Sequence, residues 1–182
     1  GELEKMRATI DTIYTALIAA AIPLSVGGLL LAHPLLRLLS VPADAYGEAW
    51  QYLIILLGGL VGSLGYNINA GILQGIGDSK TPLLFLAISS VINIGLDLLF
   101  VLVFGWGVAG AAIATVTAQA FSWLYGIRRI NQTYPDFAIH PLKFRFDSEI
   151  FRRIMRLGLP TGLQQALFSI ANLFMSRLVN LY

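Results

Sequence analysis

Five apolar stretches, each long enough to cross a lipid bilayer, dominate this sequence. A spanning α-helix needs about 20 mainly apolar residues, and the stretches that meet this length cover residues 13–32, 49–73, 82–104, 108–127 and 157–181. Only 12% of the residues are charged, whereas a soluble domain carries about 25%. Because so few polar residues are available to cover a soluble surface, the sequence predicts an all-α, polytopic membrane protein with five transmembrane helices.

Lysine and arginine are distributed unevenly over the segments that connect these stretches. If the chain crosses the membrane at each stretch, ten of the twelve basic residues fall on one side, one falls on the other, and Arg177 lies near the end of the last stretch. The basic side holds residues 1–12, the turn around Lys80 and the long segment 128–156. Basic residues favour the cytoplasmic side of a membrane, so we expect segment 128–156 to be a cytoplasmic linker and the protein to lie in the cell membrane.

Several kinds of site are disfavoured by the residue types present. Cysteine is absent, which excludes disulfides and thiolate metal ligands. The segment GILQGIGDSKT lacks the glycine that directly precedes lysine in a phosphate-binding loop, and His33 and His140 lie beside prolines, away from any acidic cluster. The apolar stretches hold no catalytic constellation of His, Cys or paired acids. We therefore expect no enzyme, no bound cofactor and no nucleic-acid partner.

Two polar residues, Asn93 and Asp97, interrupt the apolar stretch 82–104. They are four residues apart and therefore share one face of a helix. At 1.5 Å per residue, Asn93 lies about 18 Å from the cytoplasmic end, and Asn67 on the preceding stretch lies at a depth of about 17 Å. An ionised Asp at the centre of a membrane helix costs about 2.5–3.5 kcal/mol. The group predicts either a cation or proton site, with Asp97 as the titratable charge, or a hydrogen-bonded packing cluster in which Asp97 is protonated.

The last apolar stretch carries polar residues at intervals of three or four, which place them on one helix face. They are Thr161, Gln165, Ser169, Asn172 and Ser176. Such a stripe either bonds to neighbouring helices or lines an aqueous path, and Gln165, Ser169 and Asn172 are the candidates for lining a substrate path. Pairs of small residues at four-residue spacing, Gly58 with Gly62 and Gly110 with Ala114, predict closely packed helices.

The stretch GILQGIGDSKTPLLFLAISSVINIGLDLLFVLVFGWGVAGAAIATVTAQ, followed by RLGLPTGLQQALFSIANLFMSRLVN, resembles the multidrug and toxic compound extrusion (MATE) transporters. The residues that carry the resemblance are Gly75, Gly77, Asp78, Thr81, Pro82, Asn93, Asp97 and the run GVAGAAIAT. It implies a twelve-helix fold made of two six-helix bundles. The chain does not begin with Met and stops inside an apolar run, so we expect an internal piece of a longer protein. In the family's terms, residues 1–127 would belong to the N-terminal bundle as helices three to six, residues 128–156 would link the bundles, and residues 157–182 would begin the C-terminal bundle.

The resemblance also implies a function. MATE transporters exchange Na⁺ or H⁺ for organic cations, drugs and other xenobiotics, so we expect an antiporter with a small organic cation as substrate. Na⁺ or H⁺ would be the coupling ion, and the bilayer and the remainder of the chain would be the partners. In many members an Asn on helix four, with an Asn and an Asp on helix five, forms a cation site, and Asn67, Asn93 and Asp97 match these positions.

One departure from the family pattern follows Pro160. The segment TGLQQALFSIAN lacks the acidic residue that some members carry there, so a second-bundle cation site built on that residue is not expected. The alternative function is that of a flippase of related architecture for a lipid-linked precursor. Such a protein should carry more intramembrane Arg and Lys than this chain does.

Overall fold

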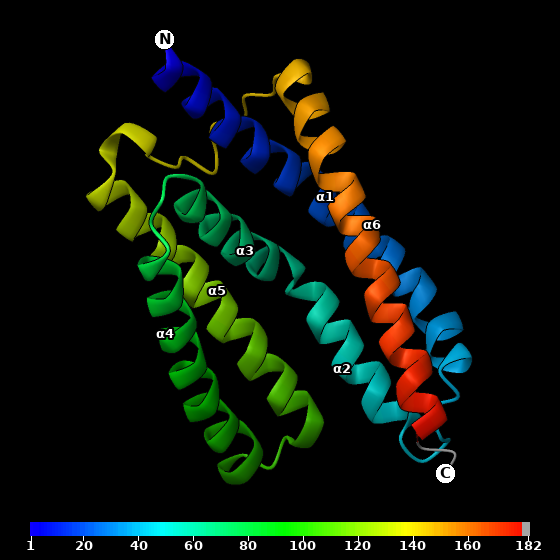
Figure 1. Cartoon of the computed structure of the whole chain (residues 1–182). Helices are drawn as coiled ribbons and strands as arrows, with labels where there is room; N and C mark the ends of the chain where they lie inside the picture. The colour runs from blue at the N-terminus through cyan, green and yellow to red at the C-terminus, as the bar shows by residue number, and fades with distance from the viewer. Residues whose placement is uncertain (180–182) are drawn as a thin grey trace.

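The computed structural model describes residues 1–179, without the side chains of residue 173 and residues 176–179. Over this range the chain is helical and has no β-strand. Its elements, in chain order, are α1 (Glu2–Leu38), α2 (Tyr46–Gly58), α3 (Leu60–Gly75), α4 (Lys80–Asp97), the π-helix η1 (Leu98–Val103), α5 (Gly107–Thr133), the 3₁₀-helix η2 (Pro135–Phe137) and α6 (Ser148–Val179). Figure 1 shows α5 between α4 on one side and α2 with α3 on the other, while α6 runs alongside α1.

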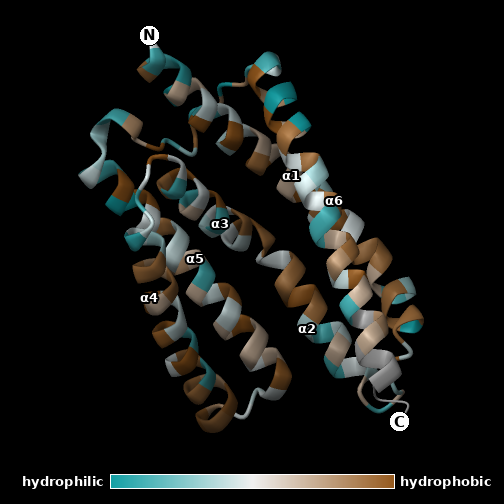
Figure 2. Ribbon diagram, in the orientation of Figure 1, coloured by the Kyte–Doolittle hydropathy of each residue, from teal (hydrophilic) through white to brown (hydrophobic). Residues whose placement is uncertain are grey.

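The predicted apolar stretches coincide with these helices. α1, the continuous helix formed by α4 and η1, and α5 are each long and apolar enough to cross a membrane, and α2 with α3 adds a fourth span if the bent pair counts as one. α6 contains the described part of the fifth stretch but does not reach the same apolar level. Its polar stripe is the reason, and residues 180 and 181 of the stretch lie outside the described range. Hydrophilic residues gather on the first turns of α6 (Figure 2).

Glycines allow the bent pair to approach α5 closely. The axes of α2 and α3 differ by 54°, and the break lies at Gly58 and Gly59, a dipeptide that offers little resistance to kinking. A Cβ atom at Gly59 would lie 2.3 Å from Cγ1 of Val116 on α5. The predicted close packing at Gly62 is confirmed, since a Cβ atom there would lie 3.1 Å from the Cα atom of Ala120, whereas Gly58 has no neighbour within 4 Å.

The buried core lies at the end of the bundle where the chain leaves α5. Its members come from α1, α3, α4, α5 and the connection to α6, and they are Ile10, Tyr14, Leu17, Leu73, Phe85, Ile130 and Ile139. Ile139 belongs to the connection and is 1% exposed. The side chain of Asn131 holds its backbone, because the Asn131 amide donates to the Ile139 carbonyl at 3.0 Å and accepts from the Ile139 N–H at 2.6 Å. The connection is therefore part of the folded core.

The predicted linker 128–156 takes in the end of α5, a non-helical connection and the start of α6. α5 continues to Thr133, and α6 begins at Ser148, so only residues 134–147 lie outside the two long helices. Asp147 caps the N-terminus of α6, because its carboxylate accepts the backbone N–H groups of Glu149 and Ile150 at 2.9 and 3.1 Å. Such a contact satisfies donors that have no partner within the helix.

Asp78 joins the turn before α4 to the end of α5. Its carboxylate accepts the hydroxyl and the backbone N–H of Thr81, the backbone N–H of Lys80 at 3.1 Å and the hydroxyl of Tyr134 at 2.9 Å. These bonds, with those from Thr81 the strongest, lower the pKa of Asp78 to about 2. A carboxylate at this place also interacts favourably with the positive end of the α4 dipole.

We expect Asp78 to stabilise the fold in a pH-dependent way. Because its pKa is lower in the folded protein than in the unfolded chain, its contribution is complete above the ordinary Asp pKa and is lost as the pH falls toward 2. Asp78→Ala should therefore lower the melting temperature of the detergent-solubilised protein at pH 7, and the difference from wild type should shrink below pH 4, as measured by thermal unfolding across that range. Asp44→Ala, at an exposed loop carboxylate that accepts only the adjacent N–H of Ala45, is the matched control. A pH-independent difference for Asp78→Ala would contradict this role.

Candidate cation site

Asn93 on α4 faces α5, where it meets Thr115. The Asn93 side-chain amide donates to the Thr115 hydroxyl at 3.3 Å, and that hydroxyl donates to the backbone carbonyl of Ala111 at 3.0 Å. Both side chains are half-buried. The hydroxyl proton of Thr115 is donated to its own helix and not to Asn93. The side-chain carbonyl oxygen of Asn93 therefore receives no bond from Thr115 and can accept from another group or bind a cation.

Asp97 follows one turn after Asn93 on α4. One of its carboxylate oxygens, Oδ1, is buried and has no hydrogen-bond partner among the described residues. A buried acceptor without a partner costs about 1–3 kcal/mol, and more when it is charged. The cost is relieved if the carboxylate binds a proton or a cation. Oxygen atoms of Asp, Asn and Thr are the ligands that hard cations prefer, so the residues present fit such an ion.

The helix geometry changes directly after Asp97. Residues Leu98–Val103 form a π-helix, and the backbone N–H of Phe104 donates to the carbonyl of Leu99, five residues earlier, at 3.0 Å. π-Helical turns are rare overall, and many of those that occur lie at functional sites. The π-helix therefore directly follows Asp97, which is the only acidic residue in the span Lys80–Val103.

Asn67 does not join the pair. It is exposed, its amide donates to the carbonyl of Ser63 on the same helix at 2.8 Å, and it lines a groove of about 440 Å³ between α1 and α3. The reason is helical phase. Gly65 and Asn69 face Trp123 on α5, and a residue two positions away from each points to the opposite side of the helix.

A buried polar cluster occupies the side of α3 that Asn67 does not share. The Tyr14 hydroxyl donates to the Asn69 side-chain carbonyl, and the Asn69 amide donates to the backbone carbonyl of Trp123 at 2.9 Å. The indole N–H of Trp123 donates to the Tyr14 hydroxyl at 3.4 Å. Asn69 is completely buried, and the cluster ties α1, α3 and α5 together. Its donors and acceptors satisfy one another, which marks it as structural.

Sequence reasoning missed Thr115 and Asn69. A signal for Thr115 was present, because Asn93 and Thr115 lie eleven residues before and after Phe104 at the hairpin, and antiparallel helices joined by a tight hairpin bring such positions to one level. No comparable signal selects Asn69 over Asn67, since both lie on one turn of α3.

The polar stripe of α6 lies on the surface of the described structure. Gln165, Ser169 and Asn172 are all exposed, and α6 contacts the rest of the bundle mainly along α1. The structure therefore does not bring these side chains to Asn93 and Asp97. Their role in lining a substrate path stays a prediction.

Residues 1–99 match the sequence model of the family described as MatE. The chain belongs to the MATE family. It is 34% identical over all 182 residues to the probable multidrug resistance protein YpnP of Bacillus subtilis, of which it covers 40%. Among solved structures, it is similar to a MATE transporter in the bent conformation, with a TM-score of 0.77 and 27% identity over 93% of this chain and 42% of that one.

A second solved MATE structure has the same architecture over this region. It is the inward-facing conformation of a multidrug resistance MATE transporter, with a TM-score of 0.75 and 25% identity over 94% of this chain and 45% of that one. The chain thus spans about two fifths of the length of the relatives that it matches. The predicted all-α, multi-pass membrane fold and the predicted family are confirmed.

Proposed function

We propose that this MATE chain is part of a cation-coupled antiporter that exports small organic cations, drugs or other xenobiotics, with Na⁺ or H⁺ as the coupling ion. Residues 1–127 would belong to the first helical bundle, segment 128–156 would link it on the cytoplasmic side to a second bundle, and residues 157–182 would begin that bundle. The names of relatives such as YpnP support the export of drugs. The concentration of basic residues in and beside the connection supports its orientation in the cell membrane.

The observation that carries the proposal is a buried oxygen of Asp97 that has no hydrogen-bond partner among the described residues, one helical turn after Asn93 and its contact with Thr115. In a carboxylate site of this kind, binding of Na⁺ or H⁺ removes the cost of the buried charge. The ion then favours the conformation in which the site is best formed, and its differential affinity for the two conformations drives the exchange. Asn93 and Thr115 would orient the carboxylate or contribute oxygen ligands, whereas Asn67, in the groove beside α1, would act elsewhere on the ion or substrate path.

The Thr115 hydroxyl provides the test. Thr115→Val keeps the shape of the side chain but removes its oxygen, and we expect the half-saturating Na⁺ concentration for export, or the proton dependence of export, to worsen by about tenfold or more, as for other residues that tune a metal site. The measurement is export of a fluorescent organic cation from vesicles that contain the complete transporter, driven in turn by a Na⁺ gradient and by a pH gradient.

Thr117→Val is the matched control. Thr117 lies on the same helix two residues further on, and its side chain is exposed, so the same chemical change there should leave the ion dependence unaltered. Unchanged ion dependence for Thr115→Val would argue against the Asn93–Thr115–Asp97 site. The gradient that drives wild-type export identifies the coupling ion.

A further inference from the structure

The connection between α5 and α6 contains an alternating segment, LKFRF, over residues 142–146. Leu142, Phe144 and Phe146 are exposed to 83%, 64% and 53%. The two residues between them, Lys143 and Arg145, line a pocket of about 310 Å³ on the other side of the segment. Successive side chains of an extended segment point to opposite sides, so the connection has one apolar face and one basic face.

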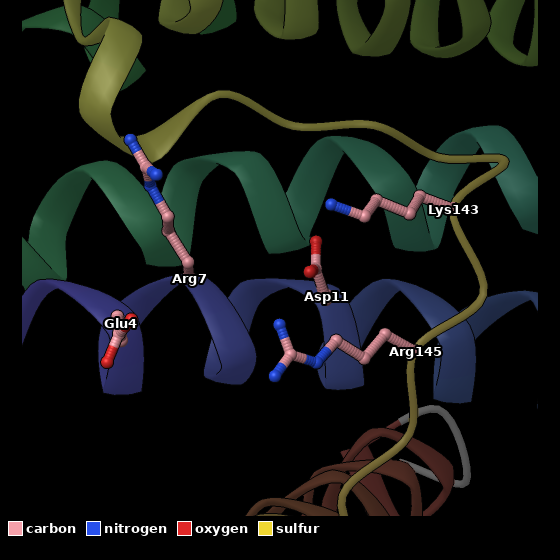
Figure 3. Close-up of a pocket in the computed structure, with 5 residues that line it drawn as sticks. All are labelled: Glu4, Arg7, Asp11, Lys143 and Arg145. Carbon is pink, nitrogen blue, oxygen red and sulfur yellow. The ribbon is translucent and has the colours of Figure 1, made fainter.

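The basic face borders a pocket that also holds a buried carboxylate. Figure 3 shows Lys143 and Arg145 extending from the connection toward Asp11 of α1, whose side chain belongs to the buried set at 8% exposure. Arg7, at the edge of the pocket, donates to the backbone carbonyl of Asp136 at 2.7 Å and lies 3.6 Å from its carboxylate. Opposite charges on the two sides of the pocket favour this orientation of the segment, which leaves its apolar face pointing away from α1.

Hydrogen bonds hold residues 145–147 against α1 at the point where a long stretch of α1 without charged side chains begins. The hydroxyl of Thr15 donates to the backbone carbonyl of Arg145 and accepts its N–H, both at 3.1 Å, and the Thr12 hydroxyl accepts the N–H of Asp147 at 3.2 Å. Residues 12–36 of α1 contain no charged side chain. Arg145, which lies between Phe144 and Phe146, is therefore level with the start of this charge-free stretch of α1, where we expect α1 to enter the bilayer.

We propose that Leu142, Phe144 and Phe146 form a membrane-interface anchor that inserts into the leaflet on the side of the connection. Aromatic side chains are favoured at this depth of a bilayer. The last turns of α5 and the first turns of α6 flank the segment with basic side chains, namely Arg128, Arg129, Arg152, Arg153 and Arg156. Such a cluster next to a membrane segment attracts anionic phospholipids. Together, the apolar face and the basic cluster fit an anionic lipid surface.

Spin-label accessibility tests the anchor. This chain has no cysteine. Once any cysteine elsewhere in the complete transporter has been replaced, a nitroxide can be attached at Phe144→Cys, at Phe146→Cys and at the exposed control His140→Cys, with the protein reconstituted in vesicles of phosphatidylethanolamine and phosphatidylglycerol. Collision with oxygen reports contact with lipid, and collision with a water-soluble nickel complex reports contact with water. We expect the ratio of oxygen to nickel collisions at residues 144 and 146 to exceed the ratio at residue 140 severalfold.

Two results would overturn the proposal. Equal ratios at residues 140, 144 and 146 would show that the segment is in water. Immobile labels at residues 144 and 146 that are shielded from both reagents would show that another part of the protein covers them. Lys143→Cys provides an internal check on the alternation, because a label there should lose the lipid preference while the two aromatic positions keep it. Loss of alternation, with all three positions equivalent, would also contradict the anchor.

Discussion

In the complete transporter, Asp97→Asn is expected to reduce gradient-driven export by more than tenfold while membrane insertion stays near normal. The substitution retains the size of the side chain but removes the charge that a cation or proton would neutralise. An amide also cannot be protonated near neutral pH, so neither Na⁺ nor H⁺ would relieve the cost of a buried negative charge at this position. A tenfold loss corresponds to about 1.4 kcal/mol, which is below the cost of one buried charged group without a partner. The measurement is dye export from vesicles under an imposed Na⁺ or pH gradient.

Ile94→Ala is the control for this substitution. Ile94 lies on the same helix and is 59% exposed, so shortening its side chain should leave export close to wild type. A packing role for Asp97 leads to a different expectation, because an amide can take part in a hydrogen-bonded network as well as a protonated acid can. Full gradient-driven export by the Asp97→Asn variant would therefore reject the coupling role.

Gly65→Ala should be the most damaging single-methyl change on α3. A Cβ atom at this position would lie 2.4 Å from Cε2 and Nε1 of Trp123. The indole ring would have to move. Two hydrogen bonds resist this movement, because the indole N–H donates to the Tyr14 hydroxyl and the Trp123 backbone carbonyl accepts the Asn69 amide. Overpacking of this kind typically costs about 1–3 kcal/mol. The loss should appear as a lower melting temperature of the solubilised protein and a lower yield of monodisperse protein.

Gly71→Ala on the same helix should have the opposite effect. No atom lies within 4 Å of a Cβ atom at Gly71, so the substitution adds only the better helix propensity of alanine, worth up to about 1 kcal/mol. The pair of variants separates packing from propensity because the chemical change is identical. A Gly65→Ala protein as stable as the Gly71→Ala protein would show that the close approach of α3 and α5 does not limit stability.

The helices could be predicted because apolar length and turn chemistry are local properties. The inward orientation of Asn93 and Asp97 also followed from local information, since their spacing of four residues puts them on one face and the cost of a membrane-buried charge selects the protein side. The π-helix could not be predicted, because the sequence LLFVLV of η1 contains no glycine or proline that would signal an irregular turn. It depends on how the whole span packs against α5.

The orientation of Asn67 could not be predicted for a related reason. Asn67 and Asn69 are two residues apart in a similar apolar setting, so their sequence surroundings do not decide which one faces the interior. The decision depends on the position of Trp123, more than fifty residues away, whose backbone carbonyl accepts the Asn69 amide. Thr115 illustrates the same limit, because its importance depends on the register of α5 against α4.

The anchoring of Ile139 in the core affects how the two halves of a transporter can move. Asn131 clamps the Ile139 backbone, and Thr12 and Thr15 hold the segment up to Asp147, so the connection is fixed to α1 and α5. If α6 opens a second bundle, as proposed above, we expect it to bend against the first in the turns after Ile150, because the Asp147 carboxylate holds the N–H groups of Glu149 and Ile150. Only a short stretch of chain is then free to bend, so we expect the proposed second bundle to rock about a nearly fixed point.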